Sequence, residues 1–158
     1  MSRRHVTMTD TRLLMTIRPS TPKSSTLHVL EDAYFKVSIN RQEHFLHIIR
    51  SDTSFVSADE ARVAHQKLVS AVTPYLRFSA MVDLRKAKGN TDNDIERVIR
   101  EVWFPTMMQL SPMAVIVGTA AGRLHVGRMF REHGSRGKIF LSEQEARQFL
   151  GLPWPIPP

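Results

Sequence analysis

Apolar and polar residues alternate in three short runs near the start of the chain, at 27–29, 34–39 and 45–49. A period of two is typical of strands that bury one face. The runs are separated only by short polar stretches, which fit tight turns. The pattern therefore predicts an opening meander of three antiparallel strands.

Four later segments repeat their apolar residues at helical spacing instead. Each is headed by a serine or threonine that can accept a hydrogen bond from the first helical turn, and these predicted caps are Ser57, Thr91, Thr119 and Ser142. Gly134 is placed to end the third helix. Pro105 falls inside the second helical pattern, where its ring and missing N–H predict a kink or a stop.

Three continuous apolar runs lie between these helices, at 78–84, 113–117 and 138–141. Runs without polar alternation are typical of parallel strands buried on both faces. Strands that alternate with helices predict right-handed parallel crossovers. We therefore expect an α/β fold: a mixed sheet of about six strands, antiparallel at its first edge and then parallel, with about four helices.

The chain has 158 residues, 42% of them hydrophobic, which suits one domain with one core. We predict a flexible basic arm over 1–26, the α/β domain over 27–151 and a Pro-rich tail over 152–158. Most of the net charge of +7 falls in the arm, so nucleic-acid binding is not favoured. There is no cysteine, no export signal and no apolar run of membrane-spanning length, and we expect a cytoplasmic protein.

Four segments resemble the STAS fold, the domain of anti-sigma-factor antagonists, and the STAS-like group of bacterial proteins. They are Val82-Asp-Leu-Arg85, Asn90 to Asp94, Ala114-Val-Ile-Val-Gly-Thr-Ala-Ala-Gly-Arg123, and Ile139 to Leu150. The resemblance covers residues 27–150. It implies a β-α superhelix with an antiparallel edge and a protein-binding surface around the start of the second helix.

The resemblance also implies a regulatory position just before that helix, where family members carry a phosphorylated serine or threonine. Here the loop reads Lys88-Gly-Asn-Thr-Asp92, without the family's Asp-Ser-Ser-Gly-like signature. Thr91 is the only hydroxyl at that place. It is either a helix cap or a regulated hydroxyl, and the capping role is favoured because Asp92 and Asp94 would repel a phosphate.

Candidate binding residues lie where two predicted parallel strands end, because ligands of open α/β sheets bind at that edge. They are Asp83, Arg85, Asn90, Thr91, Asp92, Thr119 and Arg123. Arg123 follows the Gly118-to-Gly122 turn, whose amides can hold an anion. Asp83 is interpreted as a structural hydrogen-bonding partner of the loop that follows it rather than as a general base.

Trp103, Met107 and Met108 belong to an apolar band wider than one helix face requires, and they are candidates for a docking surface. The histidines do not converge in sequence, so no metal, cofactor or catalytic residue is predicted. We expect a non-enzymatic protein-interaction module in bacterial signalling or regulation, with a protein partner or a second copy of the chain. The alternative is a binder of a small anionic metabolite, nucleotide or lipid at the strand ends.

Overall fold

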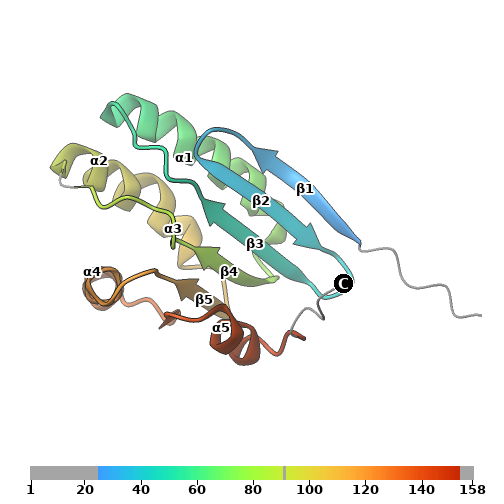
Figure 1. Cartoon of the computed structure of the whole chain (residues 1–158). Helices are drawn as coiled ribbons and strands as arrows, with labels where there is room; N and C mark the ends of the chain where they lie inside the picture. Colours follow the sequence, from blue (N-terminus) through green and yellow to red (C-terminus); the bar gives the residue numbers. More distant parts are fainter. Residues whose placement is uncertain (1–24, 91, 154–158) are drawn as a thin grey trace, which may run out of the picture.

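The computed structural model describes residues 25–90 and 92–153, which form one six-stranded mixed sheet with helices on both faces (Figure 1). The strands lie in the sheet in the order in which they occur along the chain, β1 to β6. The predicted fold class is confirmed. Residues 1–24 of the predicted arm and 154–158 of the predicted tail lie outside the described part.

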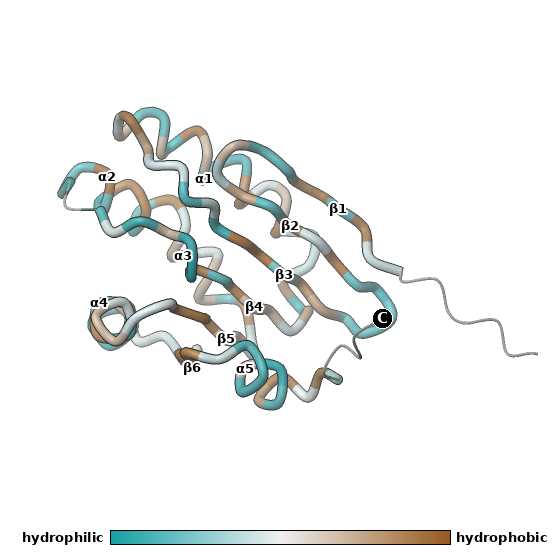
Figure 2. Tube along the Cα trace, in the orientation of Figure 1, coloured by the Kyte–Doolittle hydropathy of each residue, from teal (hydrophilic) through white to brown (hydrophobic). Residues whose placement is uncertain are grey.

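The antiparallel edge consists of three strands, β1 (Thr26–Glu31), β2 (Phe35–Asn40) and β3 (Phe45–Arg50). Three parallel strands follow, β4 (Ser79–Asp83), β5 (Met113–Ile116) and β6 (Lys138–Phe140). The central strands are the most hydrophobic part of the chain (Figure 2). Every residue of β5 is buried, as expected for a strand covered on both faces.

Most of the helices cover one face of the sheet. They are α1 (Ala58–Val72), the continuous helix formed by α2 (Asn93–Val98), η2 (Ile99–Trp103) and α3 (Phe104–Met107), and α4 (Ala120–His133). Crossovers of one hand between neighbouring parallel strands must place their helices on the same face. Leu68, Trp103 and Met129 accordingly share one core with Val82 and Val115.

The last helix, α5 (Glu143–Phe149), covers the opposite face (Figure 1). It buries Ala146 and Leu150 against Met81, Ala114 and Ile116. This second core is smaller than the first, because a single short helix covers that face.

Pro105 was predicted to stop or kink the second helix. The predicted stop is wrong, because the helix continues to Met107. The turn before Pro105 is a π-helix, in which the Phe104 N–H donates to the Ile99 carbonyl five residues back. A π turn is one way to accommodate a residue that cannot supply its own helical hydrogen bond.

The predicted caps at Ser57, Thr119 and Ser142 are confirmed, since each side chain accepts a backbone N–H of its first turn. Gly134 ends α4 with a φ of 68°, also as predicted. The predicted cap of α2 is wrong by one residue. Asp92 accepts from Asp94 N at 2.8 Å and from Ile95 N at 3.3 Å, and Thr91 itself lies outside the described residues.

Candidate functional site

A cavity of about 540 Å³ lies between the sheet and the helices of the larger core, at the carboxyl ends of β3, β4 and β5. Its walls are mostly apolar and come from every helix on that face. They include Leu68 of α1, Trp103 and Met107 of the second helix, and Val126 and Met129 of α4. A volume between about 300 and 1,000 Å³ is typical of small-molecule sites.

The rim of the cavity is polar and exposed where the chain leaves β4 and β5. Lys88, Gly89 and Asn90 line one side, and Gly118 and Thr119 line the other. A Cβ on Gly118 would lie only 3.1 Å from the Arg85 carbonyl oxygen, so a glycine lets the two loops approach closely. The Thr119 hydroxyl is engaged as the cap of α4 and accepts from Gly122 N at 3.0 Å.

Arg50, the last residue of β3, is the charged group among the buried aromatic walls of this cavity. Its guanidinium carbon lies 4.5 Å from the ring centre of Phe55 and 5.4 Å from that of Phe35. Nη1 donates to the carbonyl oxygens of Ser51 at 3.0 Å and Tyr34 at 3.3 Å, and also to the Ser51 hydroxyl. Nη2 donates to the Thr53 carbonyl at 2.6 Å.

These acceptors are all neutral. Within residues 25–90 and 92–153, no carboxylate forms an ion pair with Arg50, although Asp32 and Asp52 are near enough to favour its charge. Burial lowers the pKa of Arg50. A guanidinium nevertheless stays protonated at neutral pH, so the wall of the cavity carries a positive charge without a charged partner.

His65 of α1 lies next to Arg50 in the same wall and is 4% exposed. Its ring packs against Phe35 and Phe55 at centroid distances of 5.2 and 5.3 Å. Nδ1 lies 2.7 Å from the Ala61 carbonyl oxygen, which requires a proton on that nitrogen. Burial lowers the pKa of His65, and the charge of Arg50 lowers it further, so the ring is neutral at pH 7.

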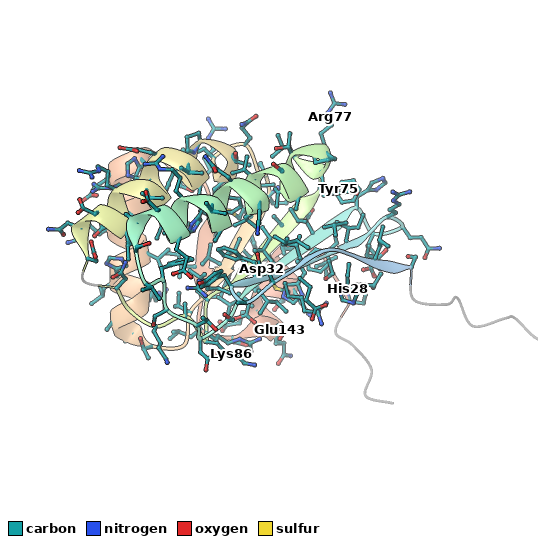
Figure 3. The ribbon with its side chains drawn as sticks, turned by 90° about the horizontal axis from the view of Figure 1, so that it is seen from above. His28, Asp32, Tyr75, Arg77, Lys86 and Glu143 are labelled. Carbon is teal, nitrogen blue, oxygen red and sulfur yellow. The ribbon has the colours of Figure 1, made fainter. Side chains whose placement is uncertain are left out.

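Arg85 follows β4 and is held very differently. Its Nε donates to Asp83 Oδ1 at 3.0 Å, and its Nη2 donates to Asp83 Oδ2 at 2.6 Å and to Glu143 Oε2 at 3.0 Å. Arg147 donates to the other oxygen of Glu143 at 3.0 Å. This alternating chain of charges ties the end of β4 to α5, and its acceptor Glu143 is labelled in Figure 3.

The charge network shifts the pKa of its acids. Burial opposes the ionisation of Asp83, but the hydrogen bonds from Arg85 outweigh it and lower the pKa of Asp83 below its usual value. The pKa of Glu143 is lowered in the same way, with Arg147 and Arg85 outweighing burial. Asp83 Oδ1 also accepts the Arg85 backbone N–H at 3.0 Å, so the predicted hydrogen bond between Asp83 and the following loop is confirmed.

His47 of β3 faces this network and packs parallel to the Phe45 ring. Its Nε2 is buried without a hydrogen-bond partner in the described part of the chain. Burial lowers the pKa of His47, while the charges of Asp83 and Glu143 act in the opposite direction. His47 is therefore neutral. None of the ionic groups beside it forms a hydrogen bond with its Nε2.

The structure brings together some of the predicted site residues and separates others. Arg85, Asn90 and Thr119 line the cavity, whereas Asp83, Asp92 and Arg123 do not. Asp83 points to the α5 face, Asp92 is used as a cap, and Arg123 is exposed on α4. Thr91 is outside the described residues.

The predicted apolar docking surface is largely interior. Trp103 and Met107 are 6% and 4% exposed and line the cavity, so neither belongs to an outer surface, while Met108 is 38% exposed. The apolar band is wide because the helix is buried against the sheet and also bounds a cavity. Sequence reasoning missed Arg50, Phe55 and His65, although Arg50 has the same signal as Arg85, a basic residue where an apolar strand run ends.

No group of three or more metal-binding side chains occurs among residues 25–90 and 92–153. In the same described segments, no helix combines the length and the apolar content needed to cross a bilayer.

Comparison with known proteins gives no family model, curated protein or solved structure that matches the chain. The resemblance to STAS-like domains therefore stays a prediction, and the cavity and the two arginine sites carry the functional argument.

Proposed function

We propose that the chain is a non-enzymatic binding protein that takes a small, largely apolar ligand into the cavity at the ends of β3, β4 and β5. The observation that supports this is the cavity itself: about 540 Å³ inside the larger core, with mostly apolar walls and a polar rim. Apolar walls around a space of this size can make packing contacts with a ligand.

The position of the cavity supports the same proposal. Open α/β sheets bind their ligands at the carboxyl ends of parallel strands, where loops from several strands meet. The loops after β4 and β5 form the rim here, and Lys88, Asn90 and Thr119 supply polar groups at the opening. The apolar walls favour a lipid or another apolar molecule over a free nucleotide or a polar metabolite.

The test is binding of neutral apolar probes, decanol and naphthalene, followed by native mass spectrometry and thermal unfolding. A ligand at 100 times its dissociation constant adds about 2.7 kcal/mol of stability. Val126→Phe extends a side chain into the cavity and is expected to weaken binding. Leu124→Phe is the matched control, because Leu124 lies on the same helix and is 74% exposed.

Two results would contradict the proposal: no probe binds the wild-type protein, or Val126→Phe and Leu124→Phe bind the probes as well as the wild type does. Equal weakening by both variants would indicate a general effect on α4 and would also count against the cavity.

A second proposal keeps the protein-interaction module that the STAS-like resemblance implies. It is supported by the exposure of the polar loop residues Lys86, Lys88 and Asn90 and of Asp92 at the start of α2. A photo-crosslinking residue at position 88 would test it in cells, with one at exposed Arg77, at the other end of α1, as the control. Adducts from both positions, or from neither, would contradict it.

A further inference from the structure

The charged wall of the cavity leaves one edge of Arg50 without an acceptor. A guanidinium has five N–H donors, arranged so that Nε and one hydrogen of Nη2 form a fork. In Arg50, Nη1 and Nη2 both donate to the backbone around Ser51 and Thr53, and Nε has no acceptor in the described part of the chain. In Arg85 the same fork is filled by the two oxygens of Asp83.

The environment of Arg50 makes a donor without an acceptor energetically unfavourable. Its guanidinium packs on the faces of Phe55 and Phe35, and its backbone acceptors hold it in that position. Arg50 is half-buried, and a charge partly withdrawn from water is stabilised by a charged partner. Within residues 25–90 and 92–153 no carboxylate forms an ion pair with Arg50, and a ligand in the cavity that Arg50 lines can supply one.

From this geometry we infer that the ligand of the cavity carries a carboxylate that accepts the Nε–Nη2 fork of Arg50, with its apolar body lying under Trp103 and Met129. This inference rests on the proposed function and narrows it to apolar carboxylic acids. One carboxylate supplies two coplanar oxygens, which match the fork, and one negative charge, which matches the single cation.

A phosphate monoester fits this position less well. It carries a charge of about −1.5 to −2 and three acceptor oxygens, so part of its charge would stay buried without a partner. The remaining cations of the cavity do not correct this. Arg85 is already engaged by Asp83 and Glu143, and Lys88 lies at the exposed rim.

The pKa of His65 tests whether a ligand pairs with Arg50. It would not change on ligand binding if Arg50 had only a structural role. The pKa of His65 is lowered by burial first and by the nearby Arg50 charge as well. The negative charge of a carboxylate on Arg50 would offset that positive charge, so the pKa of His65 should rise on binding. A neutral ligand in the same cavity leaves the charge in place.

The experiment compares decanoate, decanol and decyl phosphate on the full chain at pH 7.5, by calorimetry and by NMR titration of the His65 ring. Wild-type protein is expected to bind decanoate about tenfold more tightly than either of the others, since a charge-assisted pair contributes roughly that much. Bound decanoate should raise the pKa of His65, and bound decanol should not.

Arg50→Met should remove the preference of about tenfold for decanoate over decanol. Arg77→Met is the matched control, because Arg77 is exposed and projects away from the molecule at the far end of α1 (Figure 3). Arg50→Lys keeps the charge without the fork and should retain only part of the preference. If Arg50→Met does not fold, the wild-type comparison of the three probes and the His65 titration decide the question.

Failure of this inference can be told from failure of the proposed function. If decanol binds as tightly as decanoate, or if decanoate leaves the pKa of His65 unchanged, the cavity is a ligand site but Arg50 is not its carboxylate partner. Tighter binding of decyl phosphate than of decanoate would show that Arg50 pairs with a phosphate and would contradict the inference of a carboxylate. If none of the three probes binds, the proposed function fails together with the inference.

Discussion

Two arginines lie at strand ends of the sheet, and their hydrogen-bond acceptors are of opposite kinds, charged for one and neutral for the other. On the α5 face, Arg85 is paired with Asp83 and Glu143, next to a small and closed core. On the other face, Arg50 is bound only to neutral oxygens and lines a cavity of about 540 Å³. A basic residue at a strand end can therefore either stabilise the fold or take part in a ligand site. Its hydrogen-bond acceptors distinguish the two roles.

The largest expected difference between the faces is in their tolerance of added volume. Ala146 has no exposed surface and lies between α5 and the sheet, so Ala146→Leu should lower the free energy of unfolding by about 3 kcal/mol. Val126→Phe, which extends into the cavity, should change it by less than about 1 kcal/mol. Urea unfolding measures both, and equal losses would show that the cavity face is as closely packed as the other.

Removing the acceptor of Arg85 should have the next largest effect. Asp83→Ala leaves Arg85 with Glu143 alone and frees the backbone N–H that Asp83 accepts, and we expect a loss of about 2 kcal/mol. Asp94→Ala is the control, since Asp94 forms an exposed ion pair with Arg97 that contributes at most about 1 kcal/mol. A loss no larger than that of the control would mean that the network does not stabilise the fold.

Each face also holds a neutral histidine, buried His65 by the cavity and half-buried His47 by the network, and both have a pKa lowered chiefly by burial. The unfolded chain therefore binds protons that the folded chain does not. The free energy of unfolding is therefore unaffected by these histidines above the unfolded pKa of about 6.5. It decreases as the pH falls below that value.

The expected slope is at most about 1.4 kcal/mol per pH unit for each histidine. His47→Phe should flatten the curve of unfolding free energy between about pH 5 and 7, and should also remove the unsatisfied Nε2. The titration of Asp83 and Glu143 lies at lower pH and does not interfere. An unchanged curve for His47→Phe would show that this ring titrates normally in the folded protein.

The smallest expected effect concerns the loop that leads from β4 to α2. Asp92→Ala should cost about 1 kcal/mol, because Asp92 accepts the N–H groups of Asp94 and Ile95. Thr91→Ala should cost less, since those two donors are already engaged. A larger loss for Thr91→Ala than for Asp92→Ala would restore the capping role that the sequence assigns to Thr91.

The sequence by itself determined the order and type of the elements. Period-two runs became β1 to β3, continuous apolar runs became β4 to β6, and the caps at Ser57, Thr119 and Ser142 lie where their pattern places them. These features depend on residues within a few positions of one another, and the sequence displays such spacings directly. The hydrogen bond that Asp83 accepts from the next loop was predictable for the same reason.

Only the tertiary structure decided which of these residues form a site. Arg85 is neutralised by Glu143, 58 residues further along the chain, and Arg50 is left without a carboxylate because the elements packed around it place aromatic rings and carbonyl groups there. Trp103 and Met107 line a cavity and not an outer surface, because this side of the second helix packs toward the sheet. Pairing and burial at this range depend on how the helices pack on the sheet, and no local pattern of residues encodes that packing.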